Sequence, residues 1–204
     1  DLGMSFGSNE YPGTELIFPD PEFIEQRLDS LAGIVLTHAH EDHIGAVPYF
    51  AADFGVPLYA TPFTAELVLR KLDEAGITGK VKLNIIEKDH GKLRLGPFEI
   101  TYIPLAHSIA EGHALLIETP YGRVFHTGDW KLDEDPIIGE PTTEEELTAL
   151  GDEGILAMVC DSIMTARPQT WMPWRRPWWL LISPLFSSPA DVLLTVITPA
   201  FLIL

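Results

Sequence analysis

Thiol groups are nearly absent from this sequence, which has one cysteine, Cys160, among its 204 residues. A single cysteine excludes an internal disulfide framework and predicts a reducing, cytoplasmic setting. Cationic residues are also scarce, because 13 lysines and arginines face 30 acidic residues and leave a net charge of −17. Non-specific binding to nucleic acid depends on cationic contacts with phosphates, so this charge argues against a broad surface of that kind.

Glycine and acidic residues are almost completely absent after residue 163. All 16 glycines lie at or before Gly154, and Asp191 is the only acid after residue 163. The remaining 41 residues contain six of the 17 prolines and four of the five tryptophans. We therefore predict a folded domain over residues 1–163 and a separate hydrophobic, Trp- and Pro-rich tail over 164–204.

Two hypotheses describe the 164–204 tail. Out-of-frame translation is the first, because glycine and acidic residues are lost at one point in the sequence. A membrane anchor is the second, since the stretch from Trp178 to Leu204 is apolar. An acid near the middle of that stretch and three prolines are atypical of a transmembrane helix, so we expect no membrane association.

Short apolar runs alternate with helical patterns over residues 1–163, which predicts an α/β domain. Strands are expected at 33–37, 56–60, 83–87, 92–95, 98–103, 113–119, 123–127 and 155–159. Helices are expected at 43–54, from an N-cap at Thr61 to Gly76, and from Thr143 onwards.

Three histidines and two acids are clustered directly after the first predicted strand, in the segment His38-Ala39-His40-Glu41-Asp42-His43. Imidazole nitrogens and carboxylate oxygens are the ligands that zinc takes when thiolates are absent. In extended backbone, His38 and His40 share a side and can hold one ion, while Asp42 and His43 can face a second ion. Chance gives this H-x-H-x-D-H pattern in roughly one chain of this length in ten thousand, so it predicts metal binding.

Two further candidate ligands follow predicted strands downstream. His107 comes after the strand at 98–103, and Asp129 comes after the strand at 123–127. An acid in a small turn at the end of a buried strand is well placed to bridge two cations. His90 is expected to be a solvated loop residue, and His126 a packed residue rather than a ligand.

Longer strings around these residues resemble a known family. The segments THAHEDHIGA, PLAHSI, HTGDWKLD and VCDS are similar to the metallo-β-lactamase superfamily. Within it, HAHEDHIGAVPY and HTGDWK followed by GEPT resemble ribonuclease J of the β-CASP group. The resemblance runs from Asp1 to about Ser162. It implies an αβ/βα sandwich that binds two zinc ions and an activity that cuts RNA internally and digests it from the 5′ end.

The resemblance also implies a role for each motif residue. The first zinc would take three imidazoles and one carboxylate, from His38, His40, His107 and Asp129. Asp42 and His43 would bind the second zinc, with Asp129 bridging the two ions. Asp42 and Asp129 are the expected catalytic residues, and Asp42 would orient the attacking water. Asp1 matches an acid that supports the metal loop from outside the ligands.

Several parts of the family pattern have no counterpart in this sequence. The family closes its second zinc site with a late histidine, but no histidine here follows His126. The β-CASP domain and the closing half of the sandwich are missing as well, so the 1–163 domain is expected to be incomplete at both ends. The sequence therefore predicts one complete and one incomplete zinc site. RNA binding is expected only of the longer parent protein, for which a homo-oligomer stays open.

Two other function classes stay open beside the ribonuclease. One is a metallo-hydrolase of small esters, thioesters or lactams with the same zinc loop. The other is a zinc-binding remnant without catalytic activity. The strings HTGDWKLD and GEPTT favour the nuclease for the parent protein, whereas the missing histidine favours inactivity for these 204 residues.

Overall fold

The computed structural model describes residues 1–160 except 8, 10, 11, 88–90, 132, 134, 140 and 141, and it also describes residues 194–196. The prediction for His90 lies outside the described residues, as do both hypotheses for the tail apart from residues 194–196. Within the described part of the chain, no helix combines the length and apolar character needed to cross a bilayer.

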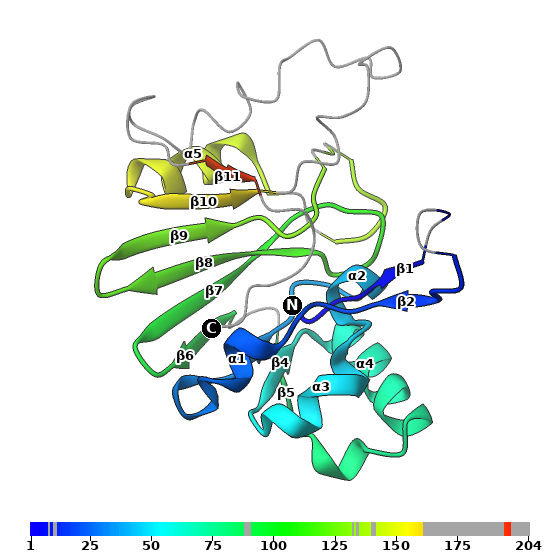
Figure 1. The fold of residues 1–204 in the computed structure, drawn as a ribbon. Helices are drawn as coiled ribbons and strands as arrows, with labels where there is room; N and C mark the ends of the chain where they lie inside the picture. The colour runs from blue at the N-terminus through cyan, green and yellow to red at the C-terminus, as the bar shows by residue number, and fades with distance from the viewer. Residues whose placement is uncertain are drawn as a thin grey trace.

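The larger sheet has six strands in the order β11-β10-β9-β8-β7-β6 (Figure 1). Their bounds are β6 (Lys92–Leu95), β7 (Phe98–Pro104), β8 (His113–Thr119), β9 (Gly122–His126), β10 (Ala157–Cys160) and β11 (Leu194–Val196). Strands β6 to β9 form an antiparallel meander, whereas β10 runs parallel to both β9 and β11. Helix α5 (Glu144–Asp152) lies in the connection from β9 to β10, as parallel pairing requires.

The smaller sheet has three parallel strands, β3 (Ile34–Val35), β4 (Leu58–Ala60) and β5 (Leu83–Ile85). Its helices are α2 (Glu41–Ile44), α3 (Val47–Phe54) and α4 (Pro62–Glu74). A two-stranded ribbon and three short helical turns complete the described elements: β1 (Ser5–Phe6), β2 (Leu16–Ile17), α1 (Glu22–Glu25), η1 (Leu28–Ser30) and η2 (Thr78–Lys80).

The core residues show how the layers stack. Side chains alternate along a strand, so Ile34 packs with the α3 and α4 cluster, whereas Val35 packs with Ile100 and Leu115 of the six-stranded sheet. Residues on the other face of that sheet pack with Leu147 of α5. Helices therefore cover the outer faces of two facing sheets. The predicted αβ/βα sandwich is confirmed for the described residues.

Most expected elements are present with shorter ends, but the expected helix at 43–54 is wrong at its start. The structure has two helices there, because Pro48 in a continuous helix would clash with the carbonyl of residue 44. The N-terminal segment fills the break: Leu2 donates a hydrogen bond to His43 O (2.7 Å) and accepts one from Ala46 N (3.0 Å). Next to it, a Cβ atom at Gly3 would lie 1.7 Å from Asp42 O, so only glycine fits at that position.

Candidate metal centre

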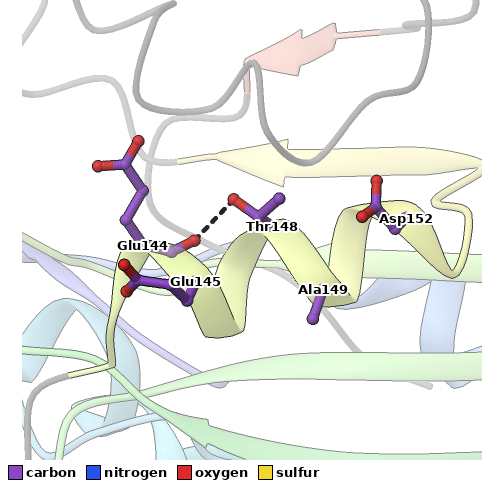
Figure 2. A pocket seen from close by; sticks show the side chains of 5 residues that line it. All are labelled: Glu144, Glu145, Thr148, Ala149 and Asp152. Atoms are coloured by element: carbon purple, nitrogen blue, oxygen red, sulfur yellow. Dashed lines mark hydrogen bonds between the residues drawn. The ribbon is translucent and has the colours of Figure 1, made fainter.

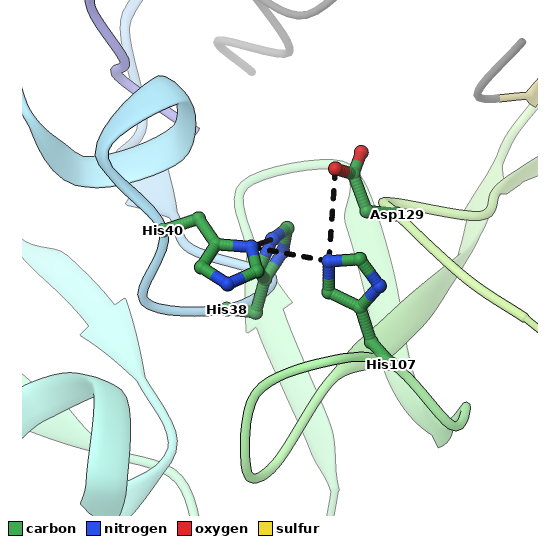
Figure 3. Close-up of side chains that lie close together, drawn as sticks. All are labelled: His38, His40, His107 and Asp129. Atoms are coloured by element: carbon green, nitrogen blue, oxygen red, sulfur yellow. Dashed lines mark hydrogen bonds and ion pairs between the residues drawn. The ribbon is translucent and has the colours of Figure 1, made fainter. Parts of the chain in front are cut away.

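Four side chains from three separate places in the chain meet at one edge of the sandwich (Figure 3). His38 and His40 follow β3, His107 lies in the loop between β7 and β8, and Asp129 follows β9. The imidazole nitrogens His38 Nε2 and His107 Nε2 each lie 3.1 Å from His40 Nδ1. Asp129 Oδ2 is 3.8 Å from His107 Nε2. The structure thus brings together the four residues expected at the first metal ion.

The spacing of these four residues fits a tetrahedral ion. Two nitrogens bound to one zinc at 2.0–2.1 Å lie about 3.3 Å apart, close to the 3.1 Å found here. One ligand atom from each of the four residues lies within 4.8 Å of the others, so together they could hold a metal ion. His40 Nδ1 faces the Nε2 atoms of both His38 and His107, but a single N–H group can donate fully to only one of these two nitrogens. A shared cation accounts for this convergence better than hydrogen bonding does.

The hydrogen bonds behind His38 determine which of its nitrogens faces the other ligands. The Thr37 hydroxyl donates to Asp1 Oδ2 (2.8 Å), so its oxygen can accept from His38 Nδ1 at 3.0 Å. The proton of a neutral His38 then sits on Nδ1, and the lone pair of Nε2 points towards His40 and His107. Burial, together with the neighbouring imidazole of His43, lowers the pKa of His38 to about 2, so the ring is neutral at physiological pH.

A second group of candidate ligands, Asp42, His43 and Asp129, lies beside the first. His43 Nδ1 donates to Asp1 Oδ2 at 2.8 Å, so its Nε2 carries the lone pair. That buried Nε2 makes no hydrogen bond among the described residues, although it lies 3.2 Å from Asp129 Oδ1 and 3.9 Å from Asp42 Oδ2. A buried nitrogen with an unused lone pair beside two carboxylates can serve as a ligand for a cation.

Asp129 belongs to both groups. Its Oδ1 faces His43 and its Oδ2 faces His107, which is the placement expected of a bridging carboxylate. Burial by itself raises the pKa of Asp129, but the imidazoles of His43 and His38 outweigh it and lower the pKa. Burial also lowers the pKa of His107. These shifts favour the neutral imidazole at His38 and His107 and the ionised carboxylate at Asp129, which are the protonation states that bind metal.

The other candidate residues have structural contacts. His126 Nδ1 accepts a hydrogen bond from Gly128 N (2.9 Å), and burial lowers its pKa to about 4, so the expected packed role fits its surroundings. Cys160 is buried in the core beside α5. A hollow along α5 is lined by Glu144, Glu145, Thr148, Ala149 and Asp152 (Figure 2). Its three carboxylates repel phosphate groups, so we do not assign nucleic-acid binding to it.

Sequence reasoning missed two residues around the site. Thr37 connects Asp1 to His38 through its hydroxyl, and its backbone N–H donates to Asp1 Oδ1 (2.7 Å). Glu111 reaches from the His107 loop to α4, where its Oε2 accepts from Phe63 N (2.9 Å). A hydroxyl directly before the first motif histidine was the available signal for Thr37, whereas no local pattern marks Glu111.

Comparisons with known proteins agree with this geometry. A family model described as a beta-lactamase superfamily domain matches residues 12–148. Among solved structures, the metallo-beta-lactamase fold protein YhfI from Bacillus subtilis superimposes with a TM-score of 0.51. That comparison covers 78% of this chain and 68% of the other at 14% sequence identity, so it bears on the fold alone.

Curated relatives give a narrower assignment. The chain is 40% identical over 167 residues to ribonuclease J from Sinorhizobium meliloti, which covers 82% of this chain and 29% of that protein. It is 39% identical over 163 residues to ribonuclease J from Helicobacter pylori, covering 79% of this chain and 24% of that protein. The expected resemblance to ribonuclease J is therefore confirmed. The chain spans less than a third of the length of these relatives.

Proposed function

Because this chain belongs to the beta-lactamase superfamily, we propose that it carries most of the metal centre of a zinc-dependent ribonuclease. The convergence of the His38, His40 and His107 nitrogens around one point carries the proposal. Similarity to several ribonucleases J supports RNA as the substrate class. Cleavage within RNA and digestion from its 5′ end, together with a cytoplasmic location, stay predictions from the sequence.

Zinc is the metal that best fits these donors. The first group offers three imidazoles and one carboxylate and includes no thiolate, a set typical of zinc. The second group offers one imidazole and two carboxylates, which is a weaker set for zinc. We therefore propose one tight site formed by His38, His40, His107 and Asp129, and one weak site formed by Asp42, His43 and the shared Asp129.

Each side chain has a task in the proposed hydrolysis of a phosphodiester. A bound metal pair supplies Lewis-acid polarisation of phosphoryl oxygens and lowers the pKa of a nearby water. Asp42 has a partly exposed carboxylate at the rim and can orient that water and accept its proton. Asp1 and Thr37 keep the protons of His43 and His38 on the nitrogens that face away from the substrate.

Metal content provides the first test. After exhaustive dialysis we expect close to one zinc per molecule in the wild-type chain and well below one in His40→Ala. His90→Ala is the matched control and is expected to retain the wild-type content, because its predicted loop position is away from the ligands. Two retained equivalents in the wild-type chain would contradict the weak second site, and none would contradict the proposed centre.

RNA cleavage provides the second test, with a 5′-monophosphorylated single-stranded RNA and zinc- or manganese-loaded protein. Residues 1–163 contain 29 acids and ten lysines and arginines, so this chain alone should bind RNA weakly. We expect cleavage from a longer protein that continues through a β-CASP domain, loss of cleavage in its Asp42→Ala variant, and no measurable cleavage by the 204 residues. Equal rates for the short and long proteins would show that the second site needs no further ligand.

A further inference from the structure

A polar contact outside the ligand set joins the two halves of the metal centre. Glu111 lies in the loop between β7 and β8, four residues after His107, and its Oε2 accepts a hydrogen bond from Phe63 N at 2.9 Å. Phe63 is the second residue of α4, which follows β4 in the three-stranded sheet. The contact therefore connects the loop that carries His107 to the half of the fold that carries His38 and His40.

The start of α4 lacks the local cap that its sequence predicts. Thr61 occupies the N-cap position, but its side chain makes no capping hydrogen bond to the helix backbone. Its hydroxyl instead donates to Thr64 Oγ1 at 3.4 Å. The first N–H groups of a helix have no partner within the helix and favour a negative charge nearby. The Glu111 carboxylate supplies that charge from 48 residues away in the sequence.

The backbone at Glu111 has an unusual conformation. Glu111 has a φ of +57°, the only positive value at a non-glycine residue in the described part of the chain. Such a conformation is unfavourable for a residue with a side chain, so other contacts must stabilise it. One of these contacts comes from two residues later in the chain, where Nδ1 of the buried His113 donates to Glu111 O at 2.7 Å. At Gly112 a Cβ atom would lie 3.2 Å from His107 Cβ, so the loop passes tightly behind the ligand.

A second series of contacts connects His113 to β4. The His113 ring packs edge-on against Tyr102, with the ring centroids 5.6 Å apart. The Tyr102 hydroxyl donates to Tyr59 O on β4 at 3.3 Å. The Glu111 side chain therefore contacts α4 directly. Its backbone carbonyl is connected to β4 through His113 and Tyr102. Movement of Glu111 would shift the His107 loop relative to the three-stranded sheet.

We propose that Glu111 is a positioning residue that sets the His107 imidazole at the correct distance from His38 and His40. The inference rests on the proposed metal centre, because it assigns Glu111 a role in building that centre. It predicts that the length of the side chain matters more than its charge. Glutamine keeps an oxygen at the reach of Phe63 N, whereas asparagine is one methylene shorter and still tolerates a positive φ.

Metal affinity of the purified chain tests this role, with Co²⁺ as the probe and its visible absorption as the reading of a tetrahedral site. We expect Glu111→Gln to bind within about threefold of wild type. Glu111→Asn should weaken binding about tenfold to a hundredfold, as loss of groups that orient ligands does. Glu66→Gln is the matched control, because it alters a carboxylate on the exposed side of α4 that pairs with Arg70 (3.1 Å). Wild-type affinity in Glu111→Asn would overturn the proposal.

A double-mutant cycle shows whether Glu111 acts through His107. In a His107→Ala background, Glu111→Asn should cause no further loss of Co²⁺ affinity, since the residue it positions is gone. An equal loss in both backgrounds would mean that Glu111 acts on overall folding instead, and would overturn the proposal. Thermal unfolding of each metal-free variant identifies any that fails to fold, and Glu111→Gly then replaces Asn because glycine adopts a positive φ freely.

Failure of the metal centre itself gives a different result. If the wild-type chain binds no Co²⁺, or if His107→Ala binds as tightly as wild type, the proposed function fails. Hydrogen exchange in the metal-free chain still reports on Glu111 in that case. The Phe63 amide should be protected in wild type and in Glu111→Gln, and should exchange faster in Glu111→Asn. Equal exchange in all three would exclude the contact on which the inference depends.

Discussion

Four of the six proposed ligands lie on one six-residue segment, His38 to His43, whereas His107 and Asp129 come from two separate strand ends of the six-stranded sheet. The contiguous group is fixed from behind by buried groups, since Asp1 and Thr37 hold the imidazoles of His38 and His43. The strand-end group is fixed by backbone turns and by Glu111, which contacts the other half of the fold.

This difference indicates that the two groups of ligands respond to different kinds of substitution. The contiguous group depends on short hydrogen bonds between its imidazoles and the side chains of Asp1 and Thr37. Losing one of these bonds removes a partner from a buried polar group. The strand-end group depends on the relative placement of two sheets, so it responds to changes well away from the ligands. Variants that act on each group separately can test the comparison.

The largest effect is expected from Thr37→Val, which removes the hydroxyl from the contiguous group and keeps the shape of the side chain. His38 Nδ1 loses its 3.0 Å partner and Asp1 Oδ2 loses one donor. We expect a loss of about 1–3 kcal/mol in the free energy of unfolding of the metal-free protein. Zinc affinity should fall about tenfold to a hundredfold. Denaturant unfolding and competition with a chromogenic chelator measure the two effects.

Thr37→Ser is the matched control for that variant. It restores a hydroxyl to the same place, so both quantities should return most of the way to their wild-type values. If Ser loses as much stability and zinc affinity as Val, a hydroxyl at this position is not sufficient to orient His38, and the assigned role of the hydroxyl is wrong.

An intermediate effect is expected from pH acting on the strand-end group through His126. Burial lowers the pKa of His126 to about 4 in the folded state, against about 6.5 when the chain is unfolded. Between these values the unfolded state binds a proton that the folded state does not. The stabilisation by neutral His126 is therefore complete above pH 6.5 and is lost as the pH falls towards 4.

Unfolding in chelator from pH 7 to pH 4 measures this dependence. His126→Asn should lose about 1–3 kcal/mol less than wild type over that interval, because it has no group to protonate there. His38 also has a lowered pKa, so some loss of stability in acid remains in the variant. Identical pH profiles for wild type and His126→Asn would rule out the assigned role of His126.

The smallest effect is expected at the ion pair between α4 and the contiguous group. Lys71 Nζ donates to Glu41 Oε2 at 2.8 Å, and both side chains are partly exposed. Pairs of this kind contribute about 0–1 kcal/mol. Lys71→Met should therefore change stability by less than about 1 kcal/mol and zinc affinity by less than threefold. A tenfold loss of zinc affinity would show that this pair, like Thr37, fixes the metal loop.

The sequence predicts local features of this molecule well. Hydrophobic periodicity identified nearly every strand of the two sheets, and Thr143 caps α5 as its sequence indicates, with Thr143 Oγ1 accepting from Glu146 N (3.2 Å). The helix at 43–54 was wrong because apolar spacing continues through Gly45, while Pro48 and the insertion of Leu2 divide it. The insertion comes from more than 40 residues away, beyond the reach of any local pattern.

The site follows the same rule. The contiguous motif is recognisable because all its donors lie within six residues, and His107 and Asp129 are candidates because each follows a predicted strand. Glu111 was not found, since a glutamate in a polar loop has nothing in its neighbours to reveal a contact with Phe63. The sequence indicates Thr61 as the cap of α4, so it gives no sign that the first N–H groups of this helix need an acceptor from elsewhere in the chain.

The N-terminal segment that fills the break between α2 and α3 also bears on the time course of folding. Residues 2–4 must dock against residues 41–46 before the metal loop has its final shape, which closes a loop of about 40 residues. Helices α3 and α4 depend on nearby contacts and can form sooner. Competence to capture zinc is therefore expected to appear after most of the helical signal during refolding, and a side chain at Gly3 would prevent this docking because it would collide with the backbone at Asp42.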